Sequence, residues 1–310
     1  MKKVLVIIIS LLSIHIVCAQ QFSANTLYDW NKIVRNPAFA GTSNTTDISF
    51  QMRQQWLGFE DSPRNQYITT QSLLKNGIGV GGVLFNNSTG PTKQTGIKAA
   101  FAKHIKLTPD TWLSLSLSFD IYQNYYDKSR LHTGLPNDPA IEESLYGQKL
   151  APDASFGAVY FSDYYYAGFS VSNITESKYD LFTTNSDFSN PISRTYFLMA
   201  GYSLEIDEEF FYKPSCVLTK TGGLPLEFDM AHKVSYKALI AGLSYRSNND
   251  VSIMLGTHFA EFYEIVYAYD YAINTLGEYS TGNHEVVLKF AIPNKNKNKG
   301  KEGRRMDVLW

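Results

Sequence analysis

A two-residue alternation of apolar and polar side chains recurs along most of this 310-residue sequence and strongly limits its possible folds. Between residues 113 and 121 every odd position is leucine, phenylalanine or isoleucine. The even positions there are Ser114, Ser116, Ser118 and Asp120. A period of two places one set of side chains on each face of a sheet. The pattern therefore predicts an all-β protein.

Runs of this kind predict about fourteen strands. Many are ten residues or longer, beyond the five or six usual in globular proteins and long enough for a tilted membrane crossing. The predicted spans are 46–57, 65–74, 77–87, 93–106, 111–126, 153–162, 164–172, 193–205, 209–219, 224–234, 237–246, 251–258, 261–273 and 282–291.

The predicted connections differ in length from one end of the strands to the other. Links after even-numbered strands are short, whereas the longest, 127–152 and 173–192, follow odd-numbered strands. Outer-membrane barrels have short periplasmic turns, long outer loops and an even strand count, and a soluble sandwich has no reason to sort its loops this way. We therefore predict a transmembrane antiparallel β-barrel of outer-membrane type over 46–291, with both ends in the periplasm.

The composition narrows the possible functions. Charged residues make up 18% of the chain, below the roughly 25% of soluble domains, and the formal net charge is −1. The basic footprint of a nucleic-acid-binding protein is absent from such a sequence. Two cysteines support neither a disulfide scaffold nor a four-cysteine zinc site.

The N-terminus has the pattern of a secretory signal peptide. Two lysines precede an apolar run to Val17, and small residues stand before a cut after Ala19. A lipoprotein anchored on Cys18 is the rival interpretation, but small residues are missing just before that cysteine. We expect a signal peptide over 1–19 and export to the cell outer membrane.

Residues 20–45 lack the strand pattern, and we predict a periplasmic or plug segment there. It either lies in the lumen or sits under the periplasmic mouth. Polar side chains on the first strand, which would face the lumen, could bind it or simply contact lumen water. The candidate lumen or plug contacts are Asn36, Pro37, Gln51, Arg53, Gln55 and Trp56.

Residues 292–310 carry six lysines and arginines against two acidic residues. Such a charge run is usually a solvated, disordered tail, and we predict a periplasmic one. The sharper alternative is a periplasmic docking peptide anchored by Leu309 and Trp310.

The residues that suggest chemistry fall short of known sites. The glycines from Gly77 to Gly82 match a dinucleotide-binding pattern, but the sequence continues as a strand where a helix is required. Glycines on a barrel strand more plausibly make room for a plug or ease curvature.

His284 beside Ser280 is the nearest approach to a hydrolase pair, without a G-x-S-x-G motif. The remaining histidines lack metal-ligand spacing, and the acidic residues of 127–152 lack calcium-loop spacing. We expect no catalytic residue, no metal, no cofactor and no enzyme activity.

Ordered short motifs extend over nearly all of 22–290. They begin with Asn36-Pro37-Ala38-Phe39-Ala40-Gly41 and Arg53-Gln54-Gln55-Trp56-Leu57-Gly58-Phe59, and continue through Lys213-Pro214-Ser215, Gly242-Leu243-Ser244-Tyr245-Arg246, Tyr267-Ala268-Tyr269-Asp270-Tyr271 and Gly282-Asn283-His284-Glu285. The set resembles the PorP/SprF family of Bacteroidetes outer-membrane proteins, which belong to the type IX secretion system. The sequence departs from many members in its basic C-terminal extension, which leaves partner binding at the periplasmic mouth open.

The resemblance implies an accessory barrel and no catalysis. Members assist secretion and surface delivery of particular adhesins, which carry a C-terminal sorting domain and in some relatives serve gliding. The implied partners are outer-membrane lipid, a periplasmic peptidoglycan-binding lipoprotein similar to PorE, ring components of the secretion system, and the adhesin cargo. Loops 127–152 and 173–192 are the natural surface for cargo. An outer-membrane pore or transporter for small or hydrophobic solutes is the main alternative, and a barrel enzyme is a third.

Overall fold

The computed structural model of the chain describes residues 25–43, 45–127, 149–178, 191–247, 250–259, 262–273 and 280–293. The predicted signal peptide over 1–19, most of the two long loops, and residues 294–310 of the tail lie outside this part. None of the described helices is long and apolar enough to cross a membrane.

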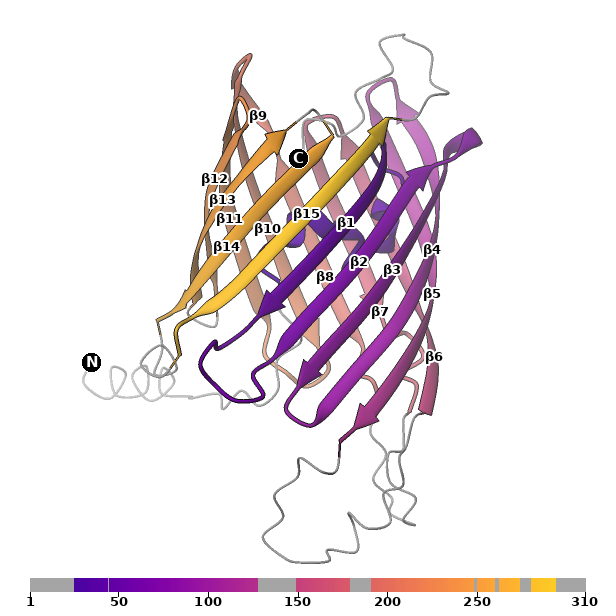
Figure 1. Ribbon diagram of the computed structural model, residues 1–310. Coiled ribbons are helices and arrows are strands. Elements are labelled where there is room, and N and C mark those ends of the chain that lie inside the picture. Colours follow the sequence, from indigo (N-terminus) through magenta and orange to yellow (C-terminus); the bar gives the residue numbers. More distant parts are fainter. Residues whose placement is uncertain are drawn as a thin grey trace, which may run out of the picture.

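Fifteen strand segments form one sheet (Figure 1). They are β1 (Thr45–Gln54), β2 (Arg64–Leu73), β3 (Ile78–Thr89), β4 (Thr92–Thr108), β5 (Thr111–Tyr126), β6 (Lys149–Ser162), β7 (Tyr165–Ser172), β8 (Thr195–Tyr202), β9 (Leu204–Asp207), β10 (Phe210–Thr221), β11 (Glu227–Tyr236), β12 (Leu239–Arg246), β13 (Asp250–Phe259), β14 (Tyr263–Ala272) and β15 (Asn283–Pro293).

The sheet closes on itself. β15 pairs antiparallel with β1 from Thr45↔Pro293 to Gln54↔His284, and every other crossing pairs with its neighbours in sequence. β8 and β9 both pair with β10 and together make a single crossing. The result is a closed antiparallel barrel of fourteen strands, which confirms the predicted fold class and strand number.

Pro214 explains why one predicted strand, 193–205, is divided. The pairing of β10 with β8 ends at Ser215↔Gly201, and its pairing with β9 begins at Tyr212↔Leu204 without a change of register. A proline has no backbone N–H to donate to a neighbouring strand, so it interrupts a ladder. On the other side of the strand, the N–H of Ser203 donates to the carbonyl of Tyr164 at 2.7 Å and so continues the pairing with the β7 side.

The first strand also ends earlier than predicted, at Gln54 rather than residue 57. Gln55 donates its N–H to the carbonyl of Pro63, at 2.8 Å, across the β1–β2 connection. Trp56 follows with a φ of 47°. This left-handed conformation is incompatible with a continuing strand, so the apolar and polar alternation has no structural meaning beyond Gln54.

Side chains of β5 show how the alternation sorts the two faces. Leu115, Leu117 and Phe119 project outward and are exposed at the barrel surface, whereas the intervening Ser116 and Ser118 are buried in the interior. The outward face of a barrel strand contacts lipid, and the inward face lines the lumen. The faces of this strand agree with those that the sequence predicts.

A charge on the outward face should therefore impair assembly according to its depth. We expect Leu117→Arg, at mid-strand, to destabilise the folded barrel by about 2–4 kcal/mol, and Leu107→Arg, near a strand end, by about 0–1 kcal/mol. Urea titration of both variants in lipid vesicles checks the difference. Equal losses would mean that residue 117 does not lie deep in the bilayer. Ser116 is unsuitable as the control because its hydroxyl and the side chain of Asn36 both lie against Gly157 in the barrel interior.

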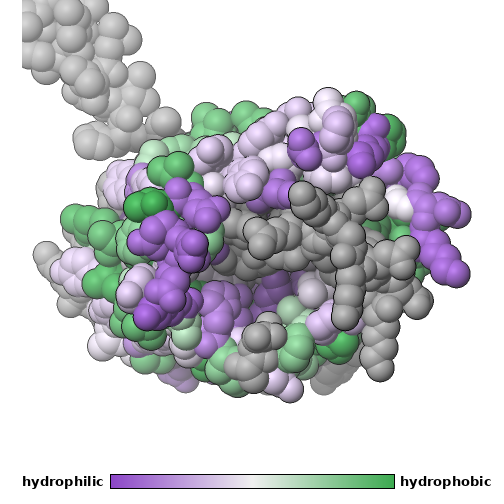
Figure 2. All heavy atoms as spheres, turned by 90° about the horizontal axis from the view of Figure 1, so that it is seen from above, coloured by the Kyte–Doolittle hydropathy of each residue, from purple (hydrophilic) through white to green (hydrophobic). Residues whose placement is uncertain are grey.

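The two ends of the barrel differ in their connections. One end, which we name the short-turn end, has the connections 74–77, 109–110, 163–164, 208–209, 237–238 and 260–262. The other, the long-loop end, has those at 55–63, 90–91, 127–148, 173–194, 222–226, 247–249 and 273–282. β1 begins and β15 ends at the short-turn end. Figure 2 views this end and shows a hollow bordered by hydrophilic residues.

Candidate functional site in the barrel lumen

The barrel interior contains residues 25–43, which we name the lumen segment (Figure 1). It includes two short 3₁₀-helices, η1 (Tyr28–Val34) and η2 (Pro37–Phe39). All its residues are buried except Val34, which is half-buried. Thr26 contacts strand residues near the long-loop end, and Ser43 bonds to Asp47 near the short-turn end. The segment therefore passes through the barrel from one end to the other.

Asn36 and Pro37 fix the turn between the two helices. Pro37 occupies the first position of η2, and the Asn36 side chain caps it by accepting the Ala38 N–H at 2.9 Å. The same amide donates to two strand carbonyls, those of Ala158 at 3.3 Å and Phe169 at 3.2 Å. Asn36 thus joins the lumen segment to β6 and β7.

The glycine-rich start of β3 provides space for the lumen segment. A Cβ atom on Gly79 would lie 2.0 Å from the Ala40 carbonyl oxygen, and one on Gly81 would lie 2.3 Å from Cδ1 of Ile33. Gly157 of β6 is equally restricted, by the Asn36 side chain at 2.2 Å. Gly79 and Gly81, two of the glycines that formally match a dinucleotide pattern, therefore allow the lumen segment to lie close against β3.

This crowding gives a matched pair of variants. We expect Gly79→Ala to lower stability by about 1–3 kcal/mol, because its methyl group meets backbone that cannot move aside cheaply. Gly82→Ala should change stability by less than about 0.5 kcal/mol, since the nearest atom to its Cβ is 3.6 Å away. The temperature at which each purified barrel loses its compact gel mobility measures the effect. Equal temperatures would show that the lumen segment does not press on β3.

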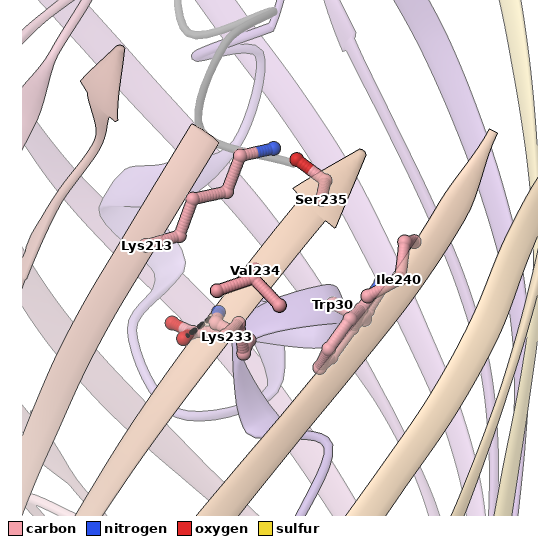
Figure 3. Close-up of a pocket in the computed structure, with 7 residues that line it drawn as sticks. Trp30, Lys213, Lys233, Val234, Ser235 and Ile240 are labelled. Atoms are coloured by element: carbon pink, nitrogen blue, oxygen red, sulfur yellow. Dashed lines mark hydrogen bonds and ion pairs between the residues drawn. The ribbon is translucent and has the colours of Figure 1, made fainter. Parts of the chain in front are cut away.

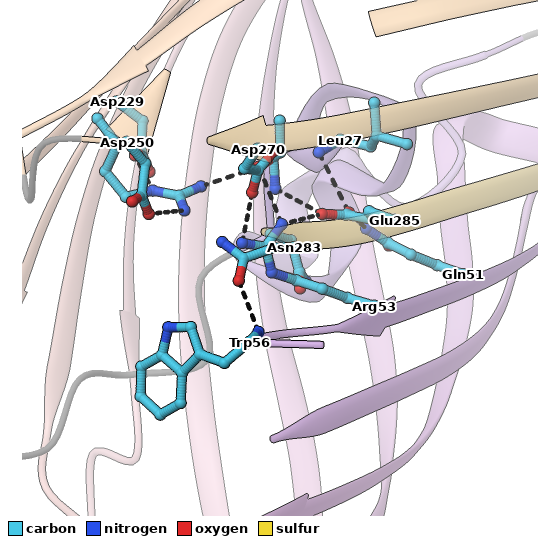
Figure 4. A network of polar contacts seen from close by, with 12 residues as sticks. Leu27, Gln51, Arg53, Trp56, Asp229, Asp250, Asp270, Asn283 and Glu285 are labelled. Atoms are coloured by element: carbon cyan, nitrogen blue, oxygen red, sulfur yellow. Dashed lines mark hydrogen bonds and ion pairs between the residues drawn. The ribbon is translucent and has the colours of Figure 1, made fainter. Parts of the chain in front are cut away.

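Near the long-loop end, Arg53 is the centre of a buried ionic network (Figure 4). Its guanidinium lies 2.5 Å from Asp270 and 2.8 Å from Glu285, and all three side chains are fully buried. Thr26 of the lumen segment completes the arrangement: its N–H donates to Glu285 at 2.8 Å, and its hydroxyl donates to Asp270 at 2.8 Å. Arg53 also donates to that hydroxyl at 3.0 Å.

A second arginine extends this network along the neighbouring strands β11, β12 and β13. Arg246 lies 2.5 Å from Asp229 and 3.7 Å from Asp250. Arg35 of the lumen segment lies 3.5 Å from the other oxygen of Asp229. Strand carboxylates near this end thus contact both strand arginines and the lumen segment, so the segment is part of the charge balance of the interior.

Asp29 of η1 is the centre of a second polar cluster, deeper in the barrel. Its carboxylate accepts hydrogen bonds from Tyr166 at 2.6 Å and from Ser215, and it is ion-paired with Lys233. Lys32 lies 3.9 Å from the same carboxylate. A buried carboxylate is tolerated when it is paired and hydrogen-bonded, and strands β7, β10 and β11 supply those partners here.

The six predicted contact residues separate into two groups. Asn36 and Pro37 belong to the lumen segment, and Gln51 and Arg53 bind it. Gln51 accepts from Asn31 at 2.9 Å and donates to Glu285 at 2.6 Å. Gln55 and Trp56 lie instead in the β1–β2 connection, where the N–H of Trp56 donates to the side chain of Asn283 at 2.9 Å. Gln55 and Trp56 lie outside the strand because β1 ends at Gln54.

Sequence reasoning missed the charged strand residues that bind Arg53 or the lumen segment. These are Asp229, Lys233, Arg246, Asp270 and Glu285, all at lumen-facing positions of their strands. They could have been found in the sequence as ionisable residues at the polar, lumen-facing positions of alternating strands. The suggested hydrolase pair is not assembled in the described part of the chain: His284 pairs with Tyr267 at 2.6 Å, and no contact joins it to Ser280.

Comparison with solved structures shows the same general fold. A TodX deletion mutant, described as a monoaromatic hydrocarbon channel, has a TM-score of 0.50 and 12% identity over 84% of this chain and 94% of that one. The Pseudomonas putida toluene transporter TodX has a TM-score of 0.47, with 10% identity over 84% and 93%. The Acinetobacter baumannii protein Omp33 has a TM-score of 0.45, with 9% identity over 81% and 100%.

A search of curated proteins found no match. The family model "Type IX secretion system membrane protein PorP/SprF", in contrast, matches residues 17–290 and so covers most of the chain. That family consists of membrane barrels of a secretion system and is not a known enzyme family. Together with the closed barrel, the match identifies an outer-membrane protein that participates in type IX secretion and belongs to the PorP/SprF family.

Proposed function

We propose that this barrel is an accessory of the type IX secretion system that assists the secretion and surface attachment of a specific adhesin through protein contacts. Its short-turn end faces the periplasm and binds a peptidoglycan-binding lipoprotein and ring components. Its long-loop end faces outward and binds the adhesin, which carries a C-terminal sorting domain. The occupied lumen is the observation that carries this proposal.

The occupied lumen favours a binding role over free passage of solutes. The lumen segment is buried almost throughout and is anchored at Thr26, Asp29 and Asn36. Removing one partner of a buried ion pair costs about 3–5 kcal/mol, and displacing the segment would leave Lys233 without Asp29 and Asp229 with one arginine instead of two. A barrel closed in this way offers its two mouths and its loops as binding surfaces.

A pore for small or hydrophobic solutes is the alternative. Its support is the general likeness of fold to a hydrocarbon channel, at 12% identity. A pore predicts ion conductance or solute uptake by purified protein in vesicles. An accessory barrel predicts little of either, together with stable protein partners.

Affinity purification from membranes of the native host tests the proposal. The tagged full-length protein and, as a control, an equally tagged unrelated outer-membrane barrel are extracted in mild detergent and analysed by mass spectrometry. We expect a peptidoglycan-binding lipoprotein and an adhesin with a sorting domain to co-purify with this protein and not with the control. A barrel recovered without partners, which conducts solutes in vesicles, would contradict the proposal and support the pore.

A further inference from the structure

A small pocket lies at the short-turn end, on the inner face of the sheet. β10, β11 and β12 form one side of it, and η1 of the lumen segment forms the other (Figure 3). Lys213 is the fourth residue of β10, and Ser235 is the last but one of β11. The pocket is lined by Asp29, Trp30, Lys213, Lys233, Val234, Ser235 and Ile240.

Lys213 points into this pocket with its ammonium group toward the hydroxyl of Ser235 (Figure 3). Its side chain is more than nine-tenths buried, with 8% of its surface exposed. Its Nζ stands 5.7 Å from the centre of the Phe211 ring, and no carboxylate in the described part of the chain pairs with it. An isolated buried ammonium is unfavourable, so burial of this kind favours an anionic partner.

The neighbouring lysines each have a carboxylate. Lys233 pairs with Asp29, and Lys32 lies 3.9 Å from the same group. Lys289 lies 3.5 Å from Asp47. Of the lysines that line the pocket, Lys233 is therefore paired, whereas Lys213 forms no ion pair with any of the described residues.

The remaining acidic residues near the pocket are engaged elsewhere or exposed. Glu264 accepts the indole N–H of Trp30 and lies 3.7 Å from His258. Glu205 of β9 is cross-strand from Phe211 and is exposed to solvent nearer the rim. The pocket is thus positively charged, with an indole and an aliphatic side chain as apolar walls.

We propose that this pocket binds a carboxylate group, with the Lys213 ammonium and the Ser235 hydroxyl as donors. The group belongs to an acidic residue of a peptide that reaches the short-turn mouth. This proposal rests on the proposed function, which places that mouth in the periplasm. It also gives the accessory role a defined contact point for an acidic partner.

Binding of capped peptides to the purified full-length barrel tests the proposal. The probes are acetyl-Gly-Glu-Gly-amide, its glutamine counterpart, and acetate, each titrated by saturation-transfer NMR. We expect the glutamate peptide to bind saturably and at least tenfold more tightly than the glutamine peptide. Lys213→Met should weaken the glutamate peptide at least tenfold, and Lys213→Arg should restore most of the affinity. Lys106→Met, which removes a lysine elsewhere at the same end, should leave it unchanged.

Comparing acetate with the glutamate peptide shows whether the pocket recognises a free carboxylate or a carboxylate on a peptide. Acetate that binds as tightly as the glutamate peptide, with both lost in Lys213→Met, supports a carboxylate site that needs no peptide backbone. Weak acetate and tight peptide binding support peptide recognition. Equal affinity for the glutamate and glutamine peptides, or unchanged binding by Lys213→Met, would overturn the proposal. Because purified protein is used, failure to recover partners from membranes would not affect this result.

Discussion

Replacing Arg53 by methionine should destabilise the barrel by about 3–5 kcal/mol. The substitution leaves Asp270 and Glu285 buried without the guanidinium that contacts both, at 2.5 and 2.8 Å. Thr26 would lose a hydrogen-bond donor at the same time, which should loosen the lumen segment at the long-loop end. Urea titration in vesicles measures the stability, and planar-bilayer recording measures any conductance that appears.

Two comparisons make this prediction specific. Arg64→Met removes an exposed arginine that donates to Gln54 on the outer face, and it should change stability by less than about 0.5 kcal/mol. Adding Asp270→Asn and Glu285→Gln to Arg53→Met should recover part of the loss, because no uncompensated charge remains. If Arg53→Met were as stable as Arg64→Met, the buried network would not be what anchors the lumen segment.

A disulfide between the lumen segment and the barrel wall should form readily and stabilise the protein. The Cβ of Ala40 lies 3.3 Å from the position of a Cβ on Gly81, close to the roughly 3.5–4.5 Å of disulfides. The variant combines Ala40→Cys and Gly81→Cys with Ile33→Val, which removes the methyl group in the way, and Cys216→Ser, which removes a free thiol. A bridge closing a loop of about 40 residues should add about 2–4 kcal/mol.

The control for this bridge is Ala40→Cys with Gly82→Cys, because residue 82 faces the opposite side of β3. We expect linked peptides in the first variant after mild oxidation and none in the second. Linkage at both positions, or at neither, would contradict the described course of the lumen segment.

The strand pattern was predictable because alternation is a local property. The serines and leucines of β5 assign both faces without knowledge of any neighbour, and the sorted loop lengths indicate an outer-membrane barrel. Pro214 was visible in the sequence, but its effect on β8 depends on which residue lies opposite. The break between β8 and β9 at Ser203 therefore could not be predicted without knowing the register of β8 and β10.

The candidate site was only partly predictable for the same reason. Gln51 and Arg53 could be assigned to the lumen by alternation, and the glycines of β3 could be suspected of making room. The partners of Arg53 come from β14 and β15, more than two hundred residues away, and only closure of the barrel brings them together. Trp56 and Gln55 were misplaced because a turn, which alternation cannot reveal, ends β1 at Gln54.

Conductance of the disulfide-linked full-length protein in planar bilayers tests the central claim most directly. The bridge between residues 40 and 81 fixes the lumen segment inside the barrel, and mass spectrometry verifies it before recording. We predict that oxidised and reduced protein both lack long-lived open-channel steps, because the segment already fills the lumen. Stable channel openings in the fully linked protein would contradict the occupied lumen and would favour a solute pore.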